Sequence, residues 1–362
     1  MIEIILQNPD TGETEKLNDL SLTINKISKL IMKKYNYQKP PIFFTIFKED
    51  PLNDAYLEED DILKEINDKK LDEKTPIWWR SSEISGDLIY KLRTDRITRA
   101  GYDLEKIQKA KIFIAGIGLL GAEIALDCAT LGIKNLSVLD YGMVDWFNIY
   151  RQPLYGRNDV FQPKVEVAKK RLELMGDIQI TSLKTEIPSF VTLSDDVKKI
   201  RDNLKTLEEE IKKCDIIVTS LDTFSARIII QTLALANNKI LINTAAGMVG
   251  GVIQIVHDKE KDPCLGCGAF FERSQDTGAC TLATFGCQKI ISGFTLEIIA
   301  DLLEEKPLTF NYLKYVPFKK EIETNMFSKG QNCIFCDSND SLIKSYKENN
   351  YENLINWLIE AK

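Results

Sequence analysis

The sequence predicts an α/β protein whose main domain is built on a mostly parallel sheet, and three features indicate this class. An apolar segment over residues 111–115 leads directly into a glycine-rich turn. Good helix formers follow over 122–131, and a second apolar segment covers 135–139. A buried strand, a helix and a second strand in this order form a βαβ unit, whose strands are parallel. The chain beyond repeats this alternation of strands and helices, which is typical of α/β domains.

The turn after the first strand has the Rossmann-like pattern Gly116-x-Gly118-x-x-Gly121. In this pattern the first glycine permits a tight turn, and the second lets backbone N–H groups approach a phosphate at the helix N-terminus. The third glycine lets the helix pack closely on the strand. Asp140 ends the second strand at the distance expected of a carboxylate that binds ribose hydroxyls. These four residues predict a nucleotide site.

The residues beyond Asp140 favour a triphosphate over the dinucleotide that this fingerprint usually binds. The polar residues that follow within 25 positions are Asn148, Arg151, Gln152 and Lys164. Two fixed cations suit ATP better than the pyrophosphate of NAD. An NAD-dependent oxidoreductase is the alternative, but the single histidine, His257, and the absence of a placed Lys-Tyr pair argue against hydride chemistry.

The composition indicates an ordinary globular protein with room for one large domain and a smaller one. The chain has 362 residues, of which 28% are charged and 44% hydrophobic, and its net charge is −7. This balance argues against nucleic-acid binding. No long apolar run or secretory signal is visible, so we expect no membrane partner. Eight cysteines are too few for a disulfide scaffold, and a reducing, cytoplasmic location is expected.

Residues 1–80 are expected to form a separate small α+β domain. The expected strands are residues 1–7, 13–20, 42–47 and 76–79, the helix is 21–37, and an acidic segment connects the last two strands. The order strand, strand, helix, strand, strand resembles the ubiquitin-like β-grasp, by topology alone. A docking role for this domain and a purely stabilising role are both open.

Residues 81–340 are expected to form the main domain, and residues 341–362 a helical tail. The helical segments expected after the βαβ unit are 165–175, 195–213 and 224–236, and the strands are 178–183, 214–220, 240–244 and 252–257. The charged segment 195–213 is expected to be an exposed excursion. Before the βαβ unit, Arg93, Arg96 and Arg99 have a spacing that places them near one helical face. The tail has apolar residues at helical spacing, which fits packing on the body or recruitment of another protein.

Asp222 follows the strand 214–220 and is expected at the same edge of the sheet as Gly118. Ligands of open parallel sheets bind at the carboxyl ends of the strands. A carboxylate there can hold Mg²⁺ against phosphate oxygens. Asp222 or Thr223 could equally cap the next helix.

Four cysteines fall in two CxxC pairs, Cys264 with Cys267 and Cys333 with Cys336. Two such pairs can complete a tetrahedron of thiolates, so they predict a structural Zn²⁺ site. A redox CxxC is the main alternative, and the duplication argues against it.

The remaining cysteines differ in their surroundings. Cys128, Cys214 and Cys287 fall within expected helices or strands, where a cysteine is most simply a buried small hydrophobic residue. Cys280 instead follows a polar, charged segment and precedes a helix that begins near Phe285. A thiol near a helix N-terminus has a lowered pKa and can act as a nucleophile, so Cys280 is a candidate nucleophile that its surroundings alone do not establish.

These motifs together resemble the ubiquitin-activating enzyme superfamily, which includes the bacterial adenylyltransferases of molybdopterin and thiazole synthesis. The resemblance covers roughly residues 90–340 and rests on the order of the glycine turn, Asp140, Asn148-x-x-Arg151-Gln152, Pro163-Lys164, Ser220-Leu-Asp222 and the two CxxC pairs. It implies an adenylation domain that joins the C-terminal glycine of a ubiquitin-like protein to AMP, with release of pyrophosphate.

The resemblance also implies roles for individual residues. Asp140 would bind ribose, Asp222 would bind Mg²⁺, and Asn148, Arg151 and Lys164 would hold the phosphates. Arg99 resembles the arginine that reaches the triphosphate of the other protomer in a homodimer. Cys280-Thr281 resembles the thioester cysteine of the single-chain activating enzymes. Thr223 departs from the family, which usually has asparagine after the aspartate.

Three functions are therefore open. The favoured one is an activating enzyme that forms a thioester on Cys280 and passes the ubiquitin-like protein to a conjugating enzyme. The second is a sulfur-carrier adenylyltransferase for cofactor or tRNA thiolation. The third is a non-catalytic scaffold, which the intact set of Arg151, Lys164 and Asp222 argues against.

Overall fold

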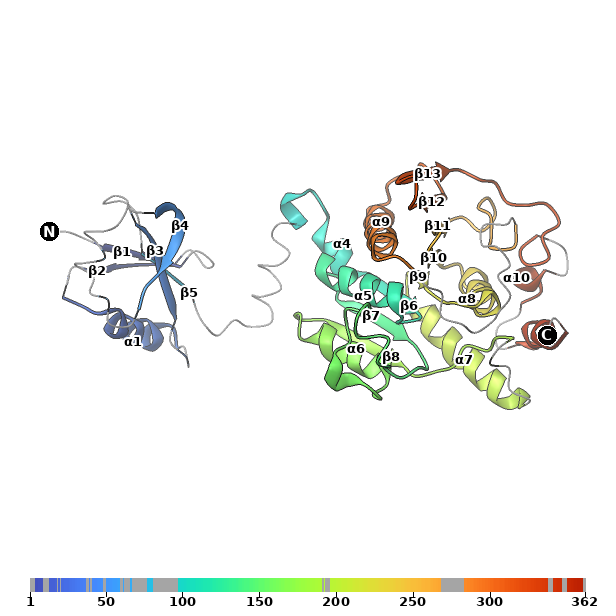
Figure 1. Cartoon of the computed structure of the whole chain (residues 1–362), viewed down its shortest axis with the longest axis horizontal. Helices are drawn as coiled ribbons and strands as arrows, with labels where there is room; N and C mark the ends of the chain where they lie inside the picture. Colours follow the sequence, from blue (N-terminus) through green and yellow to red (C-terminus); the bar gives the residue numbers. More distant parts are fainter. Residues whose placement is uncertain are drawn as a thin grey trace. The chain divides into compact units, whose positions relative to one another are not determined.

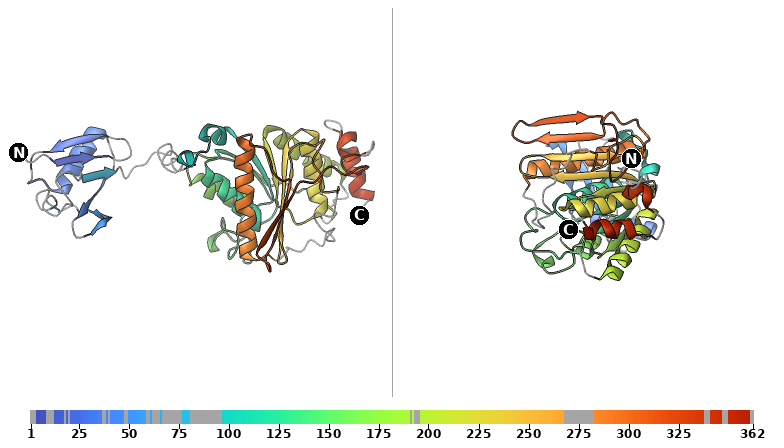
Figure 2. Two further views of the ribbon diagram at one scale, coloured as in Figure 1. Left: turned by 90° about the horizontal axis from the view of Figure 1, so that it is seen from above. Right: turned by 90° about the vertical axis from the view of Figure 1, so that its right-hand side faces the viewer.

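The computed structural model of the chain divides into two compact units, residues 1–92 and 93–362 (Figures 1 and 2). The structure describes residues 4–8, 13–17, 19, 21–36, 39, 41–47, 50–58, 61, 66, 77–80, 97–190, 192, 196–267, 283–337, 341–346 and 350–360. Within this part of the chain no helix is both long and apolar enough to cross a membrane.

In the part of the first unit that the structure describes, a five-stranded mixed sheet packs with the helix α1. Its elements are β1 (Ile4–Gln7), β2 (Thr14–Leu17), α1 (Ile24–Tyr35), β3 (Ile42–Phe47), β4 (Asp50–Tyr56) and β5 (Ile77–Arg80). The strand order is β2-β1-β5-β3-β4, in which β1 and β5 are parallel and the other neighbours are antiparallel. Among the described strands, β2 and β4 are therefore the two edges of this sheet.

Local signals in the sequence fix the helix of this unit. Thr23 caps the N-terminus of α1 by accepting a hydrogen bond from the Lys26 N–H, and Asn36 ends the helix in the left-handed conformation. The apolar face of α1, including Ile27 and Ile31, is buried against the sheet. The segment predicted as an acidic connection contains β4 instead, because its backbone pairs with β3 despite the acidic side chains in its sequence.

The second unit is an α/β domain around an eight-stranded sheet. Its elements are α4 (Leu104–Lys109), β6 (Lys111–Ala115), α5 (Leu119–Leu131), β7 (Asn135–Leu139), η1 (Arg157–Asp159), α6 (Lys164–Glu173), β8 (Gln179–Leu183), α7 (Val197–Lys213), β9 (Ile216–Thr219), α8 (Phe224–Ala236), β10 (Ile240–Ala246), β11 (Gly251–Val256), α9 (Phe285–Leu303), β12 (Tyr312–Val316), β13 (Glu321–Asn325), α10 (Leu342–Ser345) and α11 (Glu352–Glu360). The strand order is β13-β12-β11-β10-β9-β6-β7-β8. The five strands from β8 to β10 are parallel, and β11, β12 and β13 extend the sheet antiparallel. The predicted mixed α/β class with a largely parallel sheet is confirmed.

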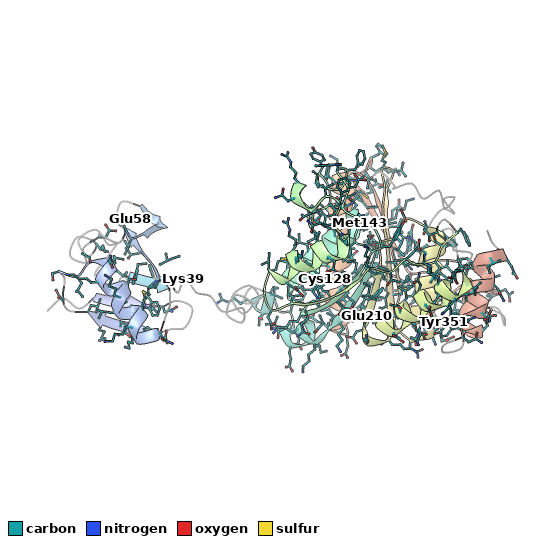
Figure 3. The ribbon with its side chains drawn as sticks, turned by 90° about the horizontal axis from the view of Figure 1, so that it is seen from below. Lys39, Glu58, Cys128, Met143, Glu210 and Tyr351 are labelled. Carbon is teal, nitrogen blue, oxygen red and sulfur yellow. The ribbon has the colours of Figure 1, made fainter. Side chains whose placement is uncertain are left out.

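Helices cover both faces of this sheet (Figure 1). One face packs on α5, α6 and α9, and Cys128 of α5 lies in that layer (Figure 3). The other face packs on α7, α8 and the C-terminal helices. The strands are apolar on both sides because each side has its own helical layer, as expected of a parallel sheet.

The order in which the chain adds parallel strands to the sheet switches sides between β6 and β9. From β6 the chain adds β7 and β8 on one side and then returns to add β9 and β10 on the other. Such a switch point opens a crevice outside the carboxyl ends of the two central strands. The segments that follow β6 and β9 carry the glycine turn and Asp222, respectively.

The prediction that the charged segment around α7 is an exposed excursion is wrong. Its apolar residues, which include Leu204 and Leu207, are buried in the second helical layer. Two acidic residues of the same helix are also buried. Glu210, which is labelled in Figure 3, accepts a hydrogen bond from the Ser137 hydroxyl, with an O–O distance of 2.6 Å. The helix is amphipathic and packs its apolar face on the sheet. The prediction was wrong because the many lysines and glutamates of the outer face dominate the composition of the segment.

The second buried acid of α7, Glu208, fastens the C-terminal tail to the body. It accepts hydrogen bonds from the hydroxyls of Tyr346 and Tyr351, the latter at 2.6 Å, and pairs with Lys212 at 3.1 Å. The tail buries Tyr351 together with Leu354, Ile355 and Leu358 of α11. The tail therefore packs on the body.

Glu208→Gln is expected to destabilise the chain by about 1–3 kcal/mol at pH 7, because the hydrogen bonds to a carboxylate become bonds to a neutral amide. Burial by itself raises the pKa of Glu208, but the hydrogen bonds from Tyr346, Tyr351 and Lys212 outweigh it and hold the pKa below its usual range. The stabilisation is therefore present above the usual glutamate pKa of about 4.3 and is lost as the pH falls through the lowered value. Urea unfolding at several pH values measures this loss. The exposed neighbour Glu209→Gln should change the free energy of unfolding by less than about 0.5 kcal/mol, and equal effects of the two substitutions would contradict the assignment.

Candidate functional site

Three segments meet at the carboxyl edge of the central strands and build the candidate site. They are the glycine turn after β6, the segment between β7 and α6, and the segment between β9 and α8. The turn is tied to both neighbouring strands, because the Gly116 N–H donates to the Leu139 carbonyl at 2.8 Å and the Ser220 N–H donates to the Ala115 carbonyl at 2.8 Å.

The three glycines of the turn occupy different surroundings. Gly116 has φ +88°, a conformation that favours glycine. A Cβ on Gly121 would lie 1.8 Å from the Gly116 carbonyl oxygen, so no side chain fits between α5 and the turn. Gly118 is the N-cap of α5, and apart from its two chain neighbours no described residue has an atom within 4 Å of the position of its Cβ. The turn is therefore closed beneath Gly121 and open at Gly118, where the helix N-terminus can receive an anion.

Backbone N–H groups hold the carboxylate of Asp140 in place. Its Oδ2 accepts from the Ile117 N–H at 3.0 Å, and its Oδ1 accepts from the Gly142 N–H at 2.7 Å. A Cβ on Gly142 would lie 3.0 Å from Asp140 Oδ1 and 3.8 Å from Lys164 Nζ. Asp140 and the Lys164 side chain therefore share one corner of the crevice beside the glycine turn.

Asp222 lies close to this corner, because its negative charge and that of Asp140 both influence Tyr141. Partial burial and the negative charges of Asp222 and Asp140 raise the pKa of Tyr141. Asp222 is exposed, and the N-cap of α8 is Thr223, which makes no side-chain capping bond. Thr223 therefore does not cap α8 through its side chain, and Asp222 lies near enough to act on Tyr141 together with Asp140.

The other predicted phosphate ligands lie on the segment between β7 and α6. The Asn148 side chain is buried, and its Oδ1 accepts from the Asp145 N–H at 2.8 Å, so its amide oxygen is engaged within its own turn. Arg151 is partly exposed. Gln152 is buried, and its Oε1 has no hydrogen-bond partner among the described residues.

Two predicted site residues, Arg99 and Cys280, do not belong to these three segments. Arg99 is exposed on a helical turn over residues 97–99, before α4. Cys280, with Thr281, lies outside the described residues, as do Arg93 and Arg96. The helix that follows Cys280 is α9, whose N-cap Thr284 accepts a hydrogen bond from the Cys287 N–H at 3.2 Å.

The four CxxC cysteines come together although 65 residues separate the two pairs in the sequence. The Sγ atoms of Cys264, Cys267, Cys333 and Cys336 all lie within 4.8 Å of one another. Sγ distances of 3.7 Å join Cys264 to Cys333 and to Cys267, and 3.4 Å joins Cys267 to Cys336. Four thiolates about 2.3 Å from a central zinc stand about 3.8 Å apart at the corners of a tetrahedron. The donor set and spacing therefore suit a metal ion of this kind.

Comparison with known families decides the identity of the fold. The model of the ThiF family matches residues 91–333. The chain belongs to the ThiF family. The resemblance to the ubiquitin-activating enzyme superfamily is thereby confirmed.

Curated relatives of this ThiF-family chain include the ubiquitin-like modifier-activating enzymes ATG7 of two yeasts. The Kluyveromyces marxianus protein is 27% identical over 279 residues, covering 73% of this chain and 45% of the relative. The Kluyveromyces lactis protein is 28% identical over 286 residues, covering 75% of this chain and 46% of the relative. The chain thus matches less than half the length of these relatives.

Solved structures agree with the ThiF-family fold. Escherichia coli MccB with MccA-N7isoASN has a TM-score of 0.57 at 17% identity, covering 70% of this chain and 75% of MccB. MccB with ATP has a TM-score of 0.52 at 17% identity, covering 68% and 71%. At this identity the similarity concerns the fold.

The sequence analysis missed three residues that shape this ThiF-family site. The buried Tyr155 hydroxyl donates to the Ile117 carbonyl at 2.7 Å and so braces the glycine turn. Gln288 of α9 donates from Nε2 to the carbonyls of Leu119 at 3.1 Å and Arg151 at 3.2 Å. Neither residue stands in a recognisable motif, so only the folded arrangement reveals it.

The third missed residue, Arg227, did leave a signal, because it is a charge within the otherwise apolar segment of α8. Its guanidinium is buried and donates to the Thr244 carbonyl at 2.9 Å and to the Leu221 carbonyl. Burial lowers its pKa to about 10, against the raising effect of Asp222, so it remains a cation at neutral pH. Arg227 thereby fixes the loop that carries Asp222.

The isolated cysteines pack as expected. Cys128, Cys214 and Cys287 are all buried. Burial raises the pKa of each thiol, in Cys214 to about 11, so these residues are poor nucleophiles.

Gly121→Ala is expected to affect mainly stability, and Gly118→Ala mainly ATP binding. Gly121→Ala should destabilise the fold strongly, by more than about 3 kcal/mol, because the new methyl group meets the Gly116 carbonyl. Gly118→Ala should change stability by less than about 1 kcal/mol but weaken ATP binding about tenfold or more, because it crowds the space over the helix N-terminus. Thermal unfolding and calorimetric titration with ATP measure both. Normal ATP affinity in Gly118→Ala would exclude phosphate binding at this turn.

Proposed function

We propose that the chain activates a ubiquitin-like protein by joining its C-terminal glycine to AMP at the expense of ATP. The observation that carries the proposal is the convergence of the open Gly118 N-terminus, the fixed Asp140 carboxylate, Lys164 and Asp222 at one switch point. The names of the curated relatives support the choice of substrate.

The chemistry requires two anions to meet. A carboxylate oxygen of the ubiquitin-like protein attacks the α-phosphorus of ATP, the bond between this phosphorus and the bridging oxygen breaks, and pyrophosphate leaves. Arg151, Lys164 and the N-terminus of α5 would offset the repulsion and stabilise the charge that develops on the leaving group. No general base is needed, because the attacking carboxylate is already ionised at neutral pH.

Asp140 and Asp222 would bind the ribose and the metal ion, respectively. Asp140, held by two N–H groups, would accept hydrogen bonds from the ribose hydroxyls. Asp222 is exposed at the adjacent strand end, where it would hold Mg²⁺. When bound, Mg²⁺ supplies positive charge to the phosphate oxygens. Gln152, whose Oε1 lacks a described partner, and Asn148 would complete the polar wall.

The activated carboxyl group would then pass to Cys280. The thiolate attacks the carbonyl carbon of the acyl adenylate, AMP leaves, and the resulting thioester is the donor for a conjugating enzyme. The position of Cys280 before α9 in the sequence supports this step, because Gln288, the fourth residue of α9, donates a hydrogen bond to the Arg151 carbonyl. The alternative is a sulfur-carrier adenylyltransferase for cofactor or tRNA thiolation, in which the acyl group passes to a persulfide without a thioester on Cys280.

A homodimer is proposed as the working form. The segment between β7 and α6 presents several large aromatic side chains: Phe147 is 77% exposed, Tyr150 82% and Phe161 71%. The rings of Trp146 and Phe161 meet edge to face at 6.5 Å, so the patch is continuous in part. Apolar patches of this kind on a monomer mark protein interfaces. A second copy seated there could bring its Arg99 to this site.

The first unit is proposed to be a β-grasp domain. Its order β2-β1-β5-β3-β4, with β1 and β5 parallel at the centre and α1 on one face, supports this assignment.

In the second unit, the four-cysteine cluster is proposed to hold structural Zn²⁺. Because all four ligand positions are occupied by sulfur, such an ion would have no position for water and no part in the reaction.

ATP–pyrophosphate exchange with a panel of ubiquitin-like proteins tests the adenylation step. Lys164→Ala should lower the exchange rate about 10²–10³-fold, because a cation at the triphosphate is lost. Lys170→Ala, an exposed lysine on the same helix, should leave the rate unchanged. Absence of exchange with every protein offered would refute adenylation and favour the scaffold.

Cys280→Ala separates the activating enzyme from the sulfur-carrier alternative. The variant should keep pyrophosphate exchange but lose the covalent adduct with the ubiquitin-like protein, which the unmodified chain should form and a reductant should cleave. Non-reducing electrophoresis detects the adduct. An exchange-competent chain that forms no adduct would support the sulfur-carrier function instead.

Metal analysis of the purified chain tests the cysteine cluster. We expect about one zinc per chain, lost in Cys333→Ser together with about 3 kcal/mol or more of stability, because the cluster then lacks a ligand in a buried site. Cys214→Ser, which changes a buried cysteine outside the cluster, should retain the zinc. A chain without metal, or one with disulfides between these cysteines, would overturn the assignment.

A further inference from the structure

The helix α5, whose N-terminus lies at the glycine turn, carries a buried carboxylate that the proposed chemistry does not use. Glu123 stands in the second turn of this helix and is 3% exposed. Its carboxylate pairs with the ammonium group of Lys289 on α9, an exposed side chain. A buried carboxylate is costly unless it is paired and hydrogen-bonded, so its place beside the site calls for an explanation.

The other partner of Glu123 is the side-chain amide of Gln288 on α9, which is 2% exposed. The Gln288 Nε2 atom lies 3.1 Å from Glu123 Oε2. The same nitrogen lies 3.1 Å from the Leu119 carbonyl oxygen and 3.2 Å from the Arg151 carbonyl oxygen. All three neighbours are acceptors, so the amide must turn its nitrogen toward them, and its Oε1 has no partner among the described residues. The carboxylate thus fixes which end of the amide meets the two carbonyls.

The two carbonyls belong to parts of the site that would meet the triphosphate. Leu119 is the first residue of α5, directly after Gly118, and Arg151 carries one of the cations proposed for the leaving group. The turn that holds Arg151 is closed locally, because the Arg151 N–H donates to the Asn148 carbonyl at 3.1 Å. The amide of Gln288 joins this turn to the N-terminus of α5 and to α9.

We propose that Gln288 and Glu123 are positioning residues for the adenylation step. Glu123 orients the amide, and the amide holds the backbone of Arg151 beside the N-terminus of α5. The Arg151 side chain is then in place when negative charge develops on the leaving pyrophosphate. The inference rests on the proposed function and deepens it, because it assigns a role to two residues that act through Arg151. A purely structural contact between α5 and α9 is the competing explanation.

A double-mutant cycle separates positioning from packing, because Gln288 bonds to the backbone of residue 151. Gln288→Leu removes the donor at similar volume and should lower the rate of ATP–pyrophosphate exchange about tenfold or more. In an Arg151→Ala chain the carbonyl remains but the guanidinium is absent, so adding Gln288→Leu there should change the rate less than about twofold. The loss of stability caused by Gln288→Leu should be the same in both chains, because the hydrogen bond is lost in both.

The pH dependence of Gln288→Glu gives a second readout. The charged side chains that face this position are Glu123 and Asp127 of α5 and Lys289 of α9. Burial and the two carboxylates should raise the pKa of a glutamate at position 288, and only its protonated form can donate to the Arg151 carbonyl. The exchange rate relative to the unmodified chain should therefore rise about threefold or more from pH 8 to pH 6. The same ratio for Gln288→Leu should stay constant.

Glu123→Gln tests the orientation of the amide. A neutral amide at position 123 can itself donate, so it no longer forces the nitrogen of Gln288 toward the two carbonyls. The exchange rate should fall about threefold or more, with no further loss when Gln288→Leu is already present. Thr295→Val is the control, because this fully buried hydroxyl of α9 donates to the Ile291 carbonyl of its own helix at 2.7 Å. It should leave exchange unchanged.

Equal losses from Gln288→Leu with arginine and with alanine at position 151 would overturn the proposal, as would an unchanged exchange rate. Identical pH profiles for Gln288→Leu and Gln288→Glu would also overturn it. In these cases exchange by the unmodified chain still supports adenylation, whereas an unmodified chain without exchange would refute adenylation and this role together. Thermal unfolding verifies the fold of each variant, and if Gln288→Leu does not fold, Gln288→Glu and Glu123→Gln decide the question.

Discussion

The contact between Gly121 and the carbonyl of Gly116 is the constraint on which the site depends. Because a Cβ would lie only 1.8 Å from that oxygen, α5 can approach the end of β6 only with hydrogen at position 121. This approach aims the first N–H groups of the helix over the turn and brings the Ile117 N–H to Asp140. Tyr155 then supports the same turn through the Ile117 carbonyl. The proposed phosphate and ribose positions thus depend on one steric contact.

A buried polar network extends from this crevice through the sheet to the cysteine cluster. Arg227 donates to Thr219, whose hydroxyl donates to Asn243 at 2.6 Å. Asn243 donates to Gln254 at 3.1 Å, and Gln254 donates to the Pro263 carbonyl, next to Cys264, at 2.8 Å. Buried polar groups of this kind are stable only when they are paired. A metal at the cysteine cluster would therefore stabilise the far end of the same network that positions Asp222.

The sequence predicted the βαβ unit, the glycine turn and the two cysteine pairs because these features follow from local pattern. The sequence also predicted that Asp140, Lys164 and Asp222 lie near one another, since the carboxyl ends of parallel strands share one edge of the sheet. The roles of Tyr155 and Gln288 could not be predicted from the sequence. Each residue donates a hydrogen bond to a backbone carbonyl, which any residue could provide. The burial of α7 was missed because its charged outer face dominates its composition. The roles of Asp140, Arg151, Lys164, Asp222, Cys280 and Arg99 all stay predictions.

A crystal structure of the chain with Mg²⁺ and a non-hydrolysable ATP analogue tests the central claim most directly. The account predicts the ribose hydroxyls on Asp140, the phosphates over Gly118 at the N-terminus of α5, with Lys164 beside them, and the metal ion on Asp222. A nucleotide bound away from the carboxyl edge of β6 and β9, or a ribose that does not contact Asp140, would contradict it.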